Sequence, residues 1–332
     1  MVDEELRSCP SCGEPGPLSA KWCEACGHDL STEPKTACCS CGELAVESDG
    51  YCHSCGHRQP GPRDHLVLSE GGVVAVTDRG QRHHHNEDAV AVATTADGGA
   101  VAVVCDGVSS TPGSAEVSLA AADAAVGSLI EALALVSPEE GPVDDGILEA
   151  AVSAARESAL AVSADVMIDE ANPPSTTLTA AVARPAGDSV WLSVAWLGDT
   201  RLYWVNDGQA HLLTVDHEIE GALTRWLGID ALNHQPQVSH QQFETTDAGP
   251  ALMVVCSDGL WRYFDPSVGE PAPDLFKRLQ DDGLEGPALA EGLVGFANDR
   301  GGHDNITVAL WSAQPAKTGD TQDEAQGEEP SQ

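Results

Sequence analysis

Short apolar runs alternate, in the middle of the chain, with longer segments whose apolar residues recur at spacings of three and four. The short runs are rich in β-branched residues and bounded by Gly and Asp, which indicates buried strands. The longer segments indicate amphipathic helices. The strands predicted in this way cover residues 89–93, 100–105, 189–197, 202–205, 251–257 and 306–311, and the helices cover 114–136, 144–166 and 287–298.

Several predicted strands are neighbours in sequence and are joined by tight turns, such as the one at Asn206, Asp207 and Gly208. Turns of this kind join antiparallel strands. An α+β fold is therefore expected, with helices that cover antiparallel sheets.

Four aspartates lie at the ends of predicted strands. Asp106 and Asp258 close two of the runs, and Asp88 and Asp304 open two others. Because the end of one antiparallel strand lies beside the start of its neighbour, the four carboxylates can meet at one rim. Carboxylates crowded in this way repel one another unless they are protonated or neutralised by cations. Oxygen ligands suit Mg²⁺ or Mn²⁺ better than zinc, so the pattern predicts a metal-assisted hydrolase.

Eight of the eleven cysteines form two copies of one pattern near the N-terminus. In each copy two Cys-x2-Cys pairs are separated by ten residues, and every cysteine recurs 29 positions later. Paired knuckles at this spacing supply four thiolates to one Zn²⁺, so two zinc ions in tandem zinc ribbons are predicted. The expected ligands are Cys9, Cys12, Cys23 and Cys26 in the first ribbon and Cys38, Cys41, Cys52 and Cys55 in the second.

Alternatives to this ligand set concern single residues and the redox state. Cys39 could replace Cys38, whereas His28 and His57 are expected to be loop residues. A disulfide framework is disfavoured because the chain begins without a secretory signal. Each ribbon is too small to bury a core, so metal binding is expected to fold it.

The charge of the chain limits its partners. It has 53 acidic and 16 basic residues, a formal net charge of −37, which disfavours nucleic acid and anionic membranes. The most apolar stretch, residues 119–136, is interrupted by Asp123 and Glu131. A cytoplasmic protein is expected. Residues 9–57 have seven acids and two lysines, which favours an adaptor or regulatory role for the ribbons, with a protein partner, over nucleic-acid binding.

Four segments follow from composition. The tandem ribbons occupy residues 1–57, a linker rich in Pro and Gly occupies 58–72, the main domain occupies 73–312, and residues 313–332 form a disordered acidic tail.

Seven short motifs occur in one order over the main domain. They are Asp78-x-Gly80 with Asn86-Glu87-Asp88, Cys105-Asp106-Gly107, Ser175-Thr176-Thr177, Gly198-Asp199-Thr200-Arg201, Leu213-Thr214-x-Asp216-His217, Ser257-Asp258-Gly259-Leu260-Trp261 and Gly302-x-Asp304-Asn305. In these motifs the chain resembles the metal-dependent serine/threonine protein phosphatases of the PPM (type 2C) family. The resemblance implies a β-sandwich of two antiparallel sheets flanked by helix pairs, with two Mn²⁺ or Mg²⁺ ions at one end.

The resemblance also implies a role for each acidic residue. Asp106 would bridge both metals. The carbonyl of Gly107, with Glu87 and Asp88, would hold one ion, and Asp258 and Asp304 would hold the other. A water activated by the metals would then hydrolyse phosphoserine or phosphothreonine in proteins. Cys105 and Cys256 are therefore expected to be buried thiols and not nucleophiles.

The chain departs from the family at the expected phosphate contact. His83 stands where the family has an arginine, and Arg82 could reach the same place. His83 and its two histidine neighbours could supply an acid or a phosphate contact, or form a solvated loop. The short segment 216–228 leaves a third metal open, and Asp199 and Arg201 are expected to pin a turn. The alternative function is a catalytically weak or inactive homologue that acts as a binding or regulatory protein.

Overall fold

The computed structural model describes residues 6–9, 11–17, 20–27, 36–46, 50–108, 112–136, 141–166, 169, 171–229, 234–245, 251–266 and 274–313. The chain divides into two units, Met1–Pro62 and Arg63–Gln332. The predicted tail, apart from residue 313, lies outside the described residues.

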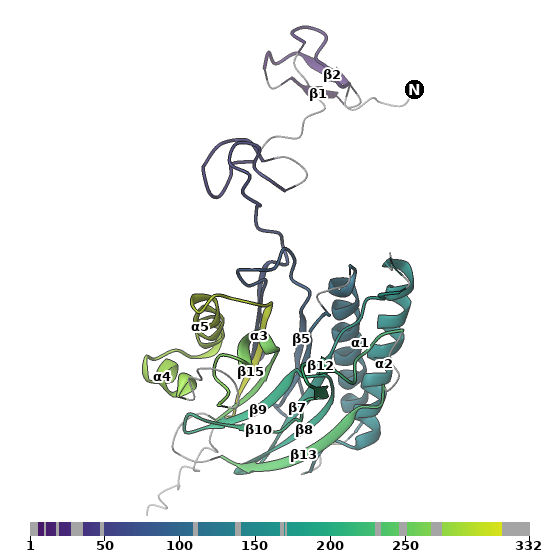
Figure 1. Ribbon diagram of the computed structural model, residues 1–332, viewed down its shortest axis with the longest axis vertical. Helices are drawn as coiled ribbons and strands as arrows, with labels where there is room; N and C mark the ends of the chain where they lie inside the picture. Colours follow the sequence, from purple (N-terminus) through teal and green to yellow (C-terminus); the bar gives the residue numbers. More distant parts are fainter. Residues whose placement is uncertain are drawn as a thin grey trace, which may run out of the picture. The chain divides into compact units, whose positions relative to one another are not determined.

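Two antiparallel sheets form the framework of the second unit (Figure 1). The six-stranded sheet has the order β10 (Gln209–Leu212), β9 (Arg201–Asn206), β14 (Ala251–Cys256), β15 (Ile306–Ala313), β4 (Val73–Asp78) and β3 (His65–Glu70). The five-stranded sheet has the order β13 (Gln237–Glu244), β8 (Ser189–Leu197), β7 (Leu178–Ala186), β6 (Ala100–Cys105) and β5 (Ala89–Thr94). The predicted α+β sandwich is confirmed.

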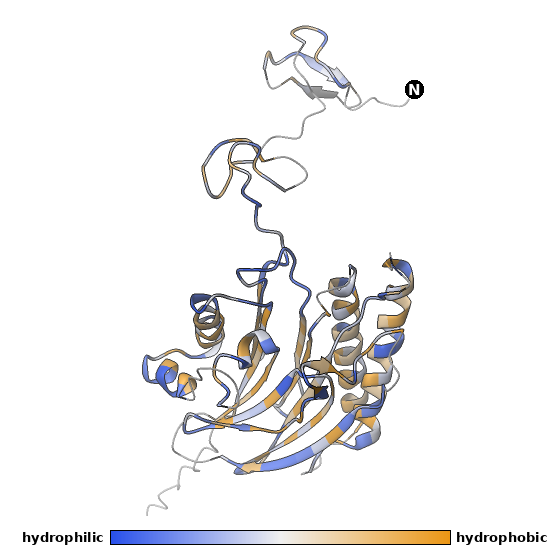
Figure 2. Ribbon diagram, in the orientation of Figure 1, coloured by the Kyte–Doolittle hydropathy of each residue, from blue (hydrophilic) through white to orange (hydrophobic). Residues whose placement is uncertain are grey.

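The central strands are buried on both faces, which explains why their sequences are continuous apolar runs. In β14, Met253 and Val255 belong to the core between the sheets, whereas Val254 and Cys256 pack toward the helices on the outer face. The edge strand β13, by contrast, has no fully buried residue and is largely hydrophilic (Figure 2).

Helices cover the outer face of each sheet (Figure 1). On the five-stranded sheet these are α1 (Ser114–Leu135) and α2 (Asp145–Val166); on the six-stranded sheet they are α3 (Asp258–Trp261), α4 (Leu275–Asp281) and α5 (Gly286–Asp299). All three predicted helices are present, with ends within one residue of the expected positions.

Among the described helices, α1 alone is long and apolar enough, by length and composition, to cross a membrane. Its buried residues include Val117, Ala121, Ala125 and Leu129, which pack in one core with residues of α2 and of the five-stranded sheet. A helix that is buried in a protein core can be as apolar as a helix that crosses a membrane. The composition of α1 therefore does not distinguish the two cases.

The predicted linker over residues 58–72 needs correction. His65–Glu70 form β3, which pairs along its whole length with β4. Most of its residues are exposed because β3 is an edge strand, so its sequence lacks the buried apolar run that marks the other strands. Gln59 is likewise bound into the second ribbon, where its N–H donates to the carbonyl of Gly50 at 2.7 Å.

Small two-stranded elements complete the described structure. In the first ribbon β1 (Leu6–Ser8) pairs with β2 (Pro15–Pro17). Within the short segment 216–228, β11 (Glu218–Ile219) pairs with β12 (Ala222–Leu223) around a tight turn.

Candidate metal centre and active site

Strand register brings the four predicted aspartates together in pairs. Ala89 lies opposite Cys105 in the β5–β6 pair, so Asp88 and Asp106 are neighbours at one end of the five-stranded sheet. In the other sheet, Cys256 lies opposite Val308. Asp258, which follows β14, and Asp304, which precedes β15, therefore lie at the same end of that sheet.

The two pairs come from different sheets and face one another across the sandwich. Burial, followed by the charges of Asp304 and Asp258, raises the pKa of Asp88 to about 7 against hydrogen bonds that lower it. Burial also raises the pKa of Asp106 well above its usual range, and the charges of Asp88 and Asp258 add to this. The pKa of Asp258 is raised by burial and then by Asp304. Asp88, Asp106 and Asp258 therefore lie close enough to one another and to Asp304 to interact, as expected of a single acidic site.

Asp199, which was expected to be structural, belongs to the same acidic site. It is buried at the end of β8, and its backbone carbonyl accepts a 3.0 Å hydrogen bond from Trp261 Nε1. Burial and then the charge of Asp258 raise the pKa of Asp199 to about 7. An aspartate just beyond the end of a long buried strand is the signal that identified Asp106, and it could have found Asp199, two residues after β8, as well.

Threonines fix the backbone of Asp106. Its carbonyl accepts hydrogen bonds from the Thr177 N–H at 2.8 Å and the Thr176 hydroxyl at 3.0 Å, and its own N–H donates to Thr177 Oγ1 at 3.1 Å. Next to it, Gly107 is required for space: a Cβ there would lie 2.5 Å from the carbonyl oxygen of Glu87. The backbone of Gly107 can therefore lie close against the loop that contains Glu87 and Asp88.

Asn305 ties the Asp88 loop to the start of β15. Its side-chain oxygen accepts the N–H of Glu87 at 2.8 Å, and its amide donates to the carbonyls of Arg79 and His85 at 2.8 and 3.0 Å. Gly80 has φ +73°, and a Cβ there would lie 2.1 Å from the carbonyl oxygen of Asp304. These contacts hold the loop that precedes Asp88 against the other sheet.

His83 and Arg82 differ in their position relative to the acidic site. His83 Nε2 lies 3.1 Å from Asp304 Oδ1, so the histidine contacts the acidic site directly. Arg82 is exposed. The structure therefore brings His83 into the site and leaves Arg82 on the surface of its loop.

Arg201 is structural, as predicted. Its guanidinium makes a bidentate pair with Asp216 at 2.9 and 2.7 Å, and bonds Asp265 at 2.8 Å. It also lies 3.5 Å from the centre of the Trp261 ring. All of these groups are largely buried, so Arg201 cross-links β9 to the chain after β10 and to the segment after α3.

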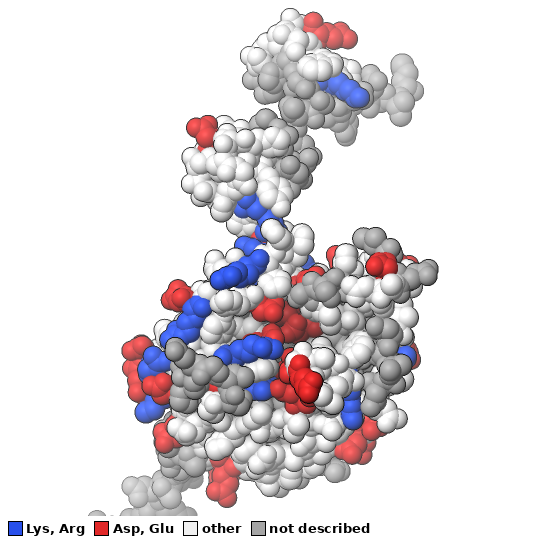
Figure 3. Space-filling view, in the orientation of Figure 1, with Lys and Arg blue, Asp and Glu red and all other residues white. Residues whose placement is uncertain are grey.

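Figure 3 shows acidic side chains gathered in a hollow on this face of the second unit, with basic side chains beside them. Among the described residues, two groups of cysteines are compact enough for their side chains to hold one metal ion, and the acidic residues form no such group.

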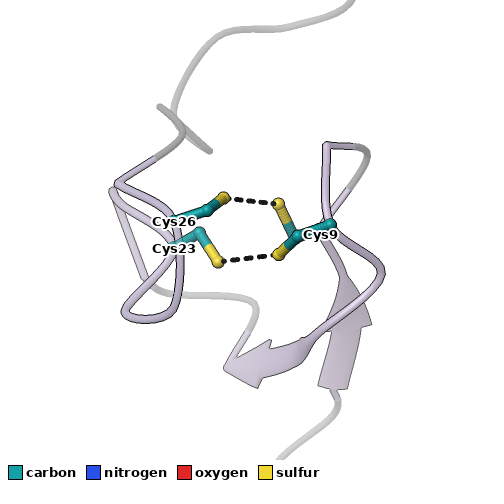
Figure 4. A group of neighbouring side chains, drawn as sticks. Cys9, Cys23 and Cys26 are labelled. Atoms are coloured by element: carbon teal, nitrogen blue, oxygen red, sulfur yellow. Dashed lines mark hydrogen bonds between the residues drawn. The ribbon is translucent and has the colours of Figure 1, made fainter.

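The eight ribbon cysteines form those two compact groups. In the first, Cys9 Sγ lies 3.7 Å from Cys26 Sγ, and Cys12 Sγ lies 3.6 Å from Cys23 Sγ (Figure 4). Four sulfurs around a tetrahedral Zn²⁺ at about 2.3 Å are about 3.8 Å apart, and a disulfide is about 2.05 Å long. The spacing therefore fits zinc, and the thiols are free.

The second group has the same geometry. Its sulfurs lie at 3.7 Å in the pairs Cys38–Cys55 and Cys41–Cys52. Cys39 is exposed and outside the group, whereas Cys38 belongs to the four cysteines that could hold a metal ion. His57 is also outside the group, and His28 lies outside the described residues.

Other candidate nucleophiles are inaccessible. Cys105 and Cys256 are fully buried in β6 and β14, as predicted. Ser193 Oγ lies 2.9 Å from His240 Nδ1, and His240 Nε2 lies 2.6 Å from Asp145 Oδ1, which resembles a hydrolase triad. Ser193 is only 1% exposed, however, and its oxygen accepts the N–H of Val143. These hydrogen bonds therefore connect α2, β8 and β13 and have a structural role.

Comparisons with known proteins agree with the acidic site. The family model described as protein phosphatase 2C matches residues 77–296. The serine/threonine phosphatase stp of Listeria welshimeri is 27% identical over 257 residues, which is 70% of this chain and 92% of that protein. The stp of Listeria monocytogenes is 27% identical over 253 residues, with the same coverage of each chain.

Solved structures share the fold of the second unit. The serine/threonine phosphatase of S. agalactiae is 21% identical with a TM-score of 0.55, over 73% of this chain and 99% of that one. Phosphatase Stp1 from Staphylococcus aureus is 19% identical with a TM-score of 0.53, over 77% of this chain and 99% of that one. On the family match and the motifs that form the site, this chain belongs to the protein phosphatase 2C family.

Proposed function

We propose that this protein hydrolyses phosphoserine and phosphothreonine in protein substrates, with two Mn²⁺ or Mg²⁺ ions at the acidic site. The observation that carries the proposal is the convergence of Asp88, Asp106, Asp258 and Asp304 from the ends of two sheets. Their donor atoms are all oxygen, which suits hard divalent cations. Burial raises the pKa values of Asp88, Asp106 and Asp258, and repulsion between the carboxylates adds to this effect. Bound cations would relieve that repulsion.

The residues divide between two ions. Asp106 would bridge them, Asp88 with Glu87 and the Gly107 carbonyl would hold one, and Asp258 with Asp304 would hold the other. When bound, the metal pair supplies an activated water molecule for attack on phosphorus and neutralises charge on the phosphoryl group.

Side chains of the protein orient this site. Asp88 accepts a hydrogen bond from Ser257, and His83 holds the carboxylate of Asp304. His83 is then placed to donate a proton or a hydrogen bond at the edge of the site, a role that the exposed Arg82 would share only if its loop moved.

The zinc ribbons are proposed to be an adaptor or regulatory module with a protein partner, in a cytoplasmic enzyme. Their sulfur spacing supports two structural Zn²⁺ ions, and their acidic composition argues against nucleic acid as the partner.

The decisive experiment is turnover of p-nitrophenyl phosphate and of a phosphothreonine peptide by the full chain. Activity should appear with Mn²⁺, disappear when the metal is withheld, and be lost in Asp106→Asn, which binds metal less well but keeps the side-chain volume. Activity that persists in this variant would overturn the mechanism. Metal binding without turnover in the wild type would instead support the inactive binding homologue.

A further inference from the structure

Arg262 is the basic side chain that contacts the acidic site from α3. Its Nε donates a 2.9 Å hydrogen bond to Asp258 Oδ2, one helical turn earlier. The guanidinium also lies in the field of Asp199 and of Glu218 in β11. The Arg262 side chain is 52% exposed, whereas that of Asp258 is 14% exposed. Arg262 therefore lies at the solvent side of the carboxylates, where a ligand would enter.

A phosphate monoester needs a cation at that position. It arrives as a dianion at a site lined with carboxylates, and charge on its oxygens is stabilised by metals and by fixed donors. A guanidinium suits these oxygens because it presents several N–H donors in a planar fork. The Nε–H of Arg262 is held by Asp258, and a guanidinium has four further N–H donors on its Nη atoms.

Three other arginines near the site make hydrogen bonds or ion pairs elsewhere. Arg63 donates to the backbone carbonyls of Asp88 and Ala115, and Arg79 donates to the carbonyl of His83. Arg201 is buried between Asp216 and Asp265. Of the arginines that the structure describes, Arg262 alone combines solvent exposure with an ion pair to one of the four strand-end aspartates.

We propose that Arg262 binds the phosphoryl oxygens of the substrate, an inference that rests on the phosphatase function proposed above. The same guanidinium pairs with Asp258, so it would also compete with a metal for this carboxylate. Removing the Arg262 side chain should therefore weaken phosphate binding without weakening metal binding, so the two roles can be measured separately.

The test uses the full-length protein with Arg262→Ala. The KM for a phosphothreonine peptide and the inhibition constant of inorganic phosphate should each rise about ten- to hundredfold, as expected for loss of a charge-assisted hydrogen bond. The Kd for Mn²⁺, measured by calorimetry, should stay unchanged or fall. Arg262→Lys should be intermediate, because lysine keeps the charge and loses the fork.

Arg278→Ala is the matched control. Arg278 makes the same kind of ion pair one helical turn away, with Asp274 at 3.2 Å, and its side chain is 50% exposed. The inference is overturned if Arg262→Ala behaves like this control. It is also overturned if phosphate and Mn²⁺ affinities weaken together, because Arg262 would then only orient Asp258. A wild type that neither binds Mn²⁺ nor turns over substrate would instead refute the phosphatase function, and this inference with it.

Discussion

The hydroxyl of Ser257 donates a 2.8 Å hydrogen bond to Asp88 Oδ2, although 169 residues separate them in sequence. The hydroxyl oxygen of Ser257 accepts the N–H of Thr307 at 3.0 Å. Ser257 follows β14 in one sheet, and Asp88 precedes β5 in the other. This buried contact links the two sheets at the acidic site, so the orientation of Asp88 depends on both.

Ser257→Ala should therefore weaken both the metal site and the fold. It leaves the Thr307 N–H and one oxygen of Asp88 without their partner in a buried place, which costs about 1–3 kcal/mol in the free energy of unfolding. The Kd for Mn²⁺ should rise, as read by titration calorimetry. Ser153→Ala is the control for urea denaturation, because Ser153 lies on the exposed face of α2 and its hydroxyl donates to the carbonyl of Glu149 in the same helix. Equal effects of the two substitutions would contradict a special role for Ser257.

The stability of the protein free of Mn²⁺ and Mg²⁺ should depend on pH. The pKa of Asp88 and of Asp199 is raised, chiefly by burial, from an ordinary value of 3.8 to about 7. Protonation therefore favours the folded state: this contribution to stability is fully present below about pH 4 and is lost as pH rises to about 7. Thermal unfolding, followed by the fluorescence of the buried tryptophans, should show a midpoint that falls over this range.

Saturating Mn²⁺ provides the comparison for that experiment. Bound cations favour the ionised carboxylates, so the decline with pH should flatten or reverse when metal is added. Asp106→Asn, which replaces a buried carboxyl group of raised pKa with a neutral amide, should stabilise the metal-free protein near neutral pH. Unchanged slopes with and without metal would show that the carboxylates do not share a cation site.

His83→Arg tests the histidine that contacts Asp304. If the side chain at this position faces the phosphate, an arginine should maintain or raise kcat/KM on a phosphothreonine peptide, because it adds donors for the phosphoryl oxygens. A collapse in rate with unchanged Mn²⁺ affinity would instead show that a proton or a hydrogen bond specific to histidine is needed.

The zinc content of the chain should be two ions by elemental analysis. Cys38→Ser should reduce it to one, because Cys38 Sγ lies in the second sulfur group, and Cys39→Ser should leave it at two because the Cys39 thiol lies outside that group. The Gln59 amide donates to Cys38 Sγ at 3.3 Å and supports that sulfur as the ligand. Zinc retained in Cys38→Ser and lost in Cys39→Ser would reverse the assignment.

Most helices and central strands could be predicted because their residues are buried on one stripe or on both faces, which leaves a strong apolar pattern. Strand β3 was missed because an edge strand is exposed and needs no such pattern. The pairing of Asp88 with Asp106 could be anticipated from strand polarity. Asp199, near the end of β8, carries the same signal as Asp106, whereas Arg262 does not, because its role depends on its ion pair with Asp258.

The sequence alone identified the eight ribbon cysteines and the four aspartates, because the spacing in a knuckle and the position near the end of a strand are local features. Only the tertiary structure decided which groups share one site. The acidic site joins the ends of two sheets, and the hydrogen bond from Ser257 to Asp88 crosses between them. Contacts between residues so distant in the chain depend on how the two sheets pack, and the local sequence pattern around each residue does not specify that packing.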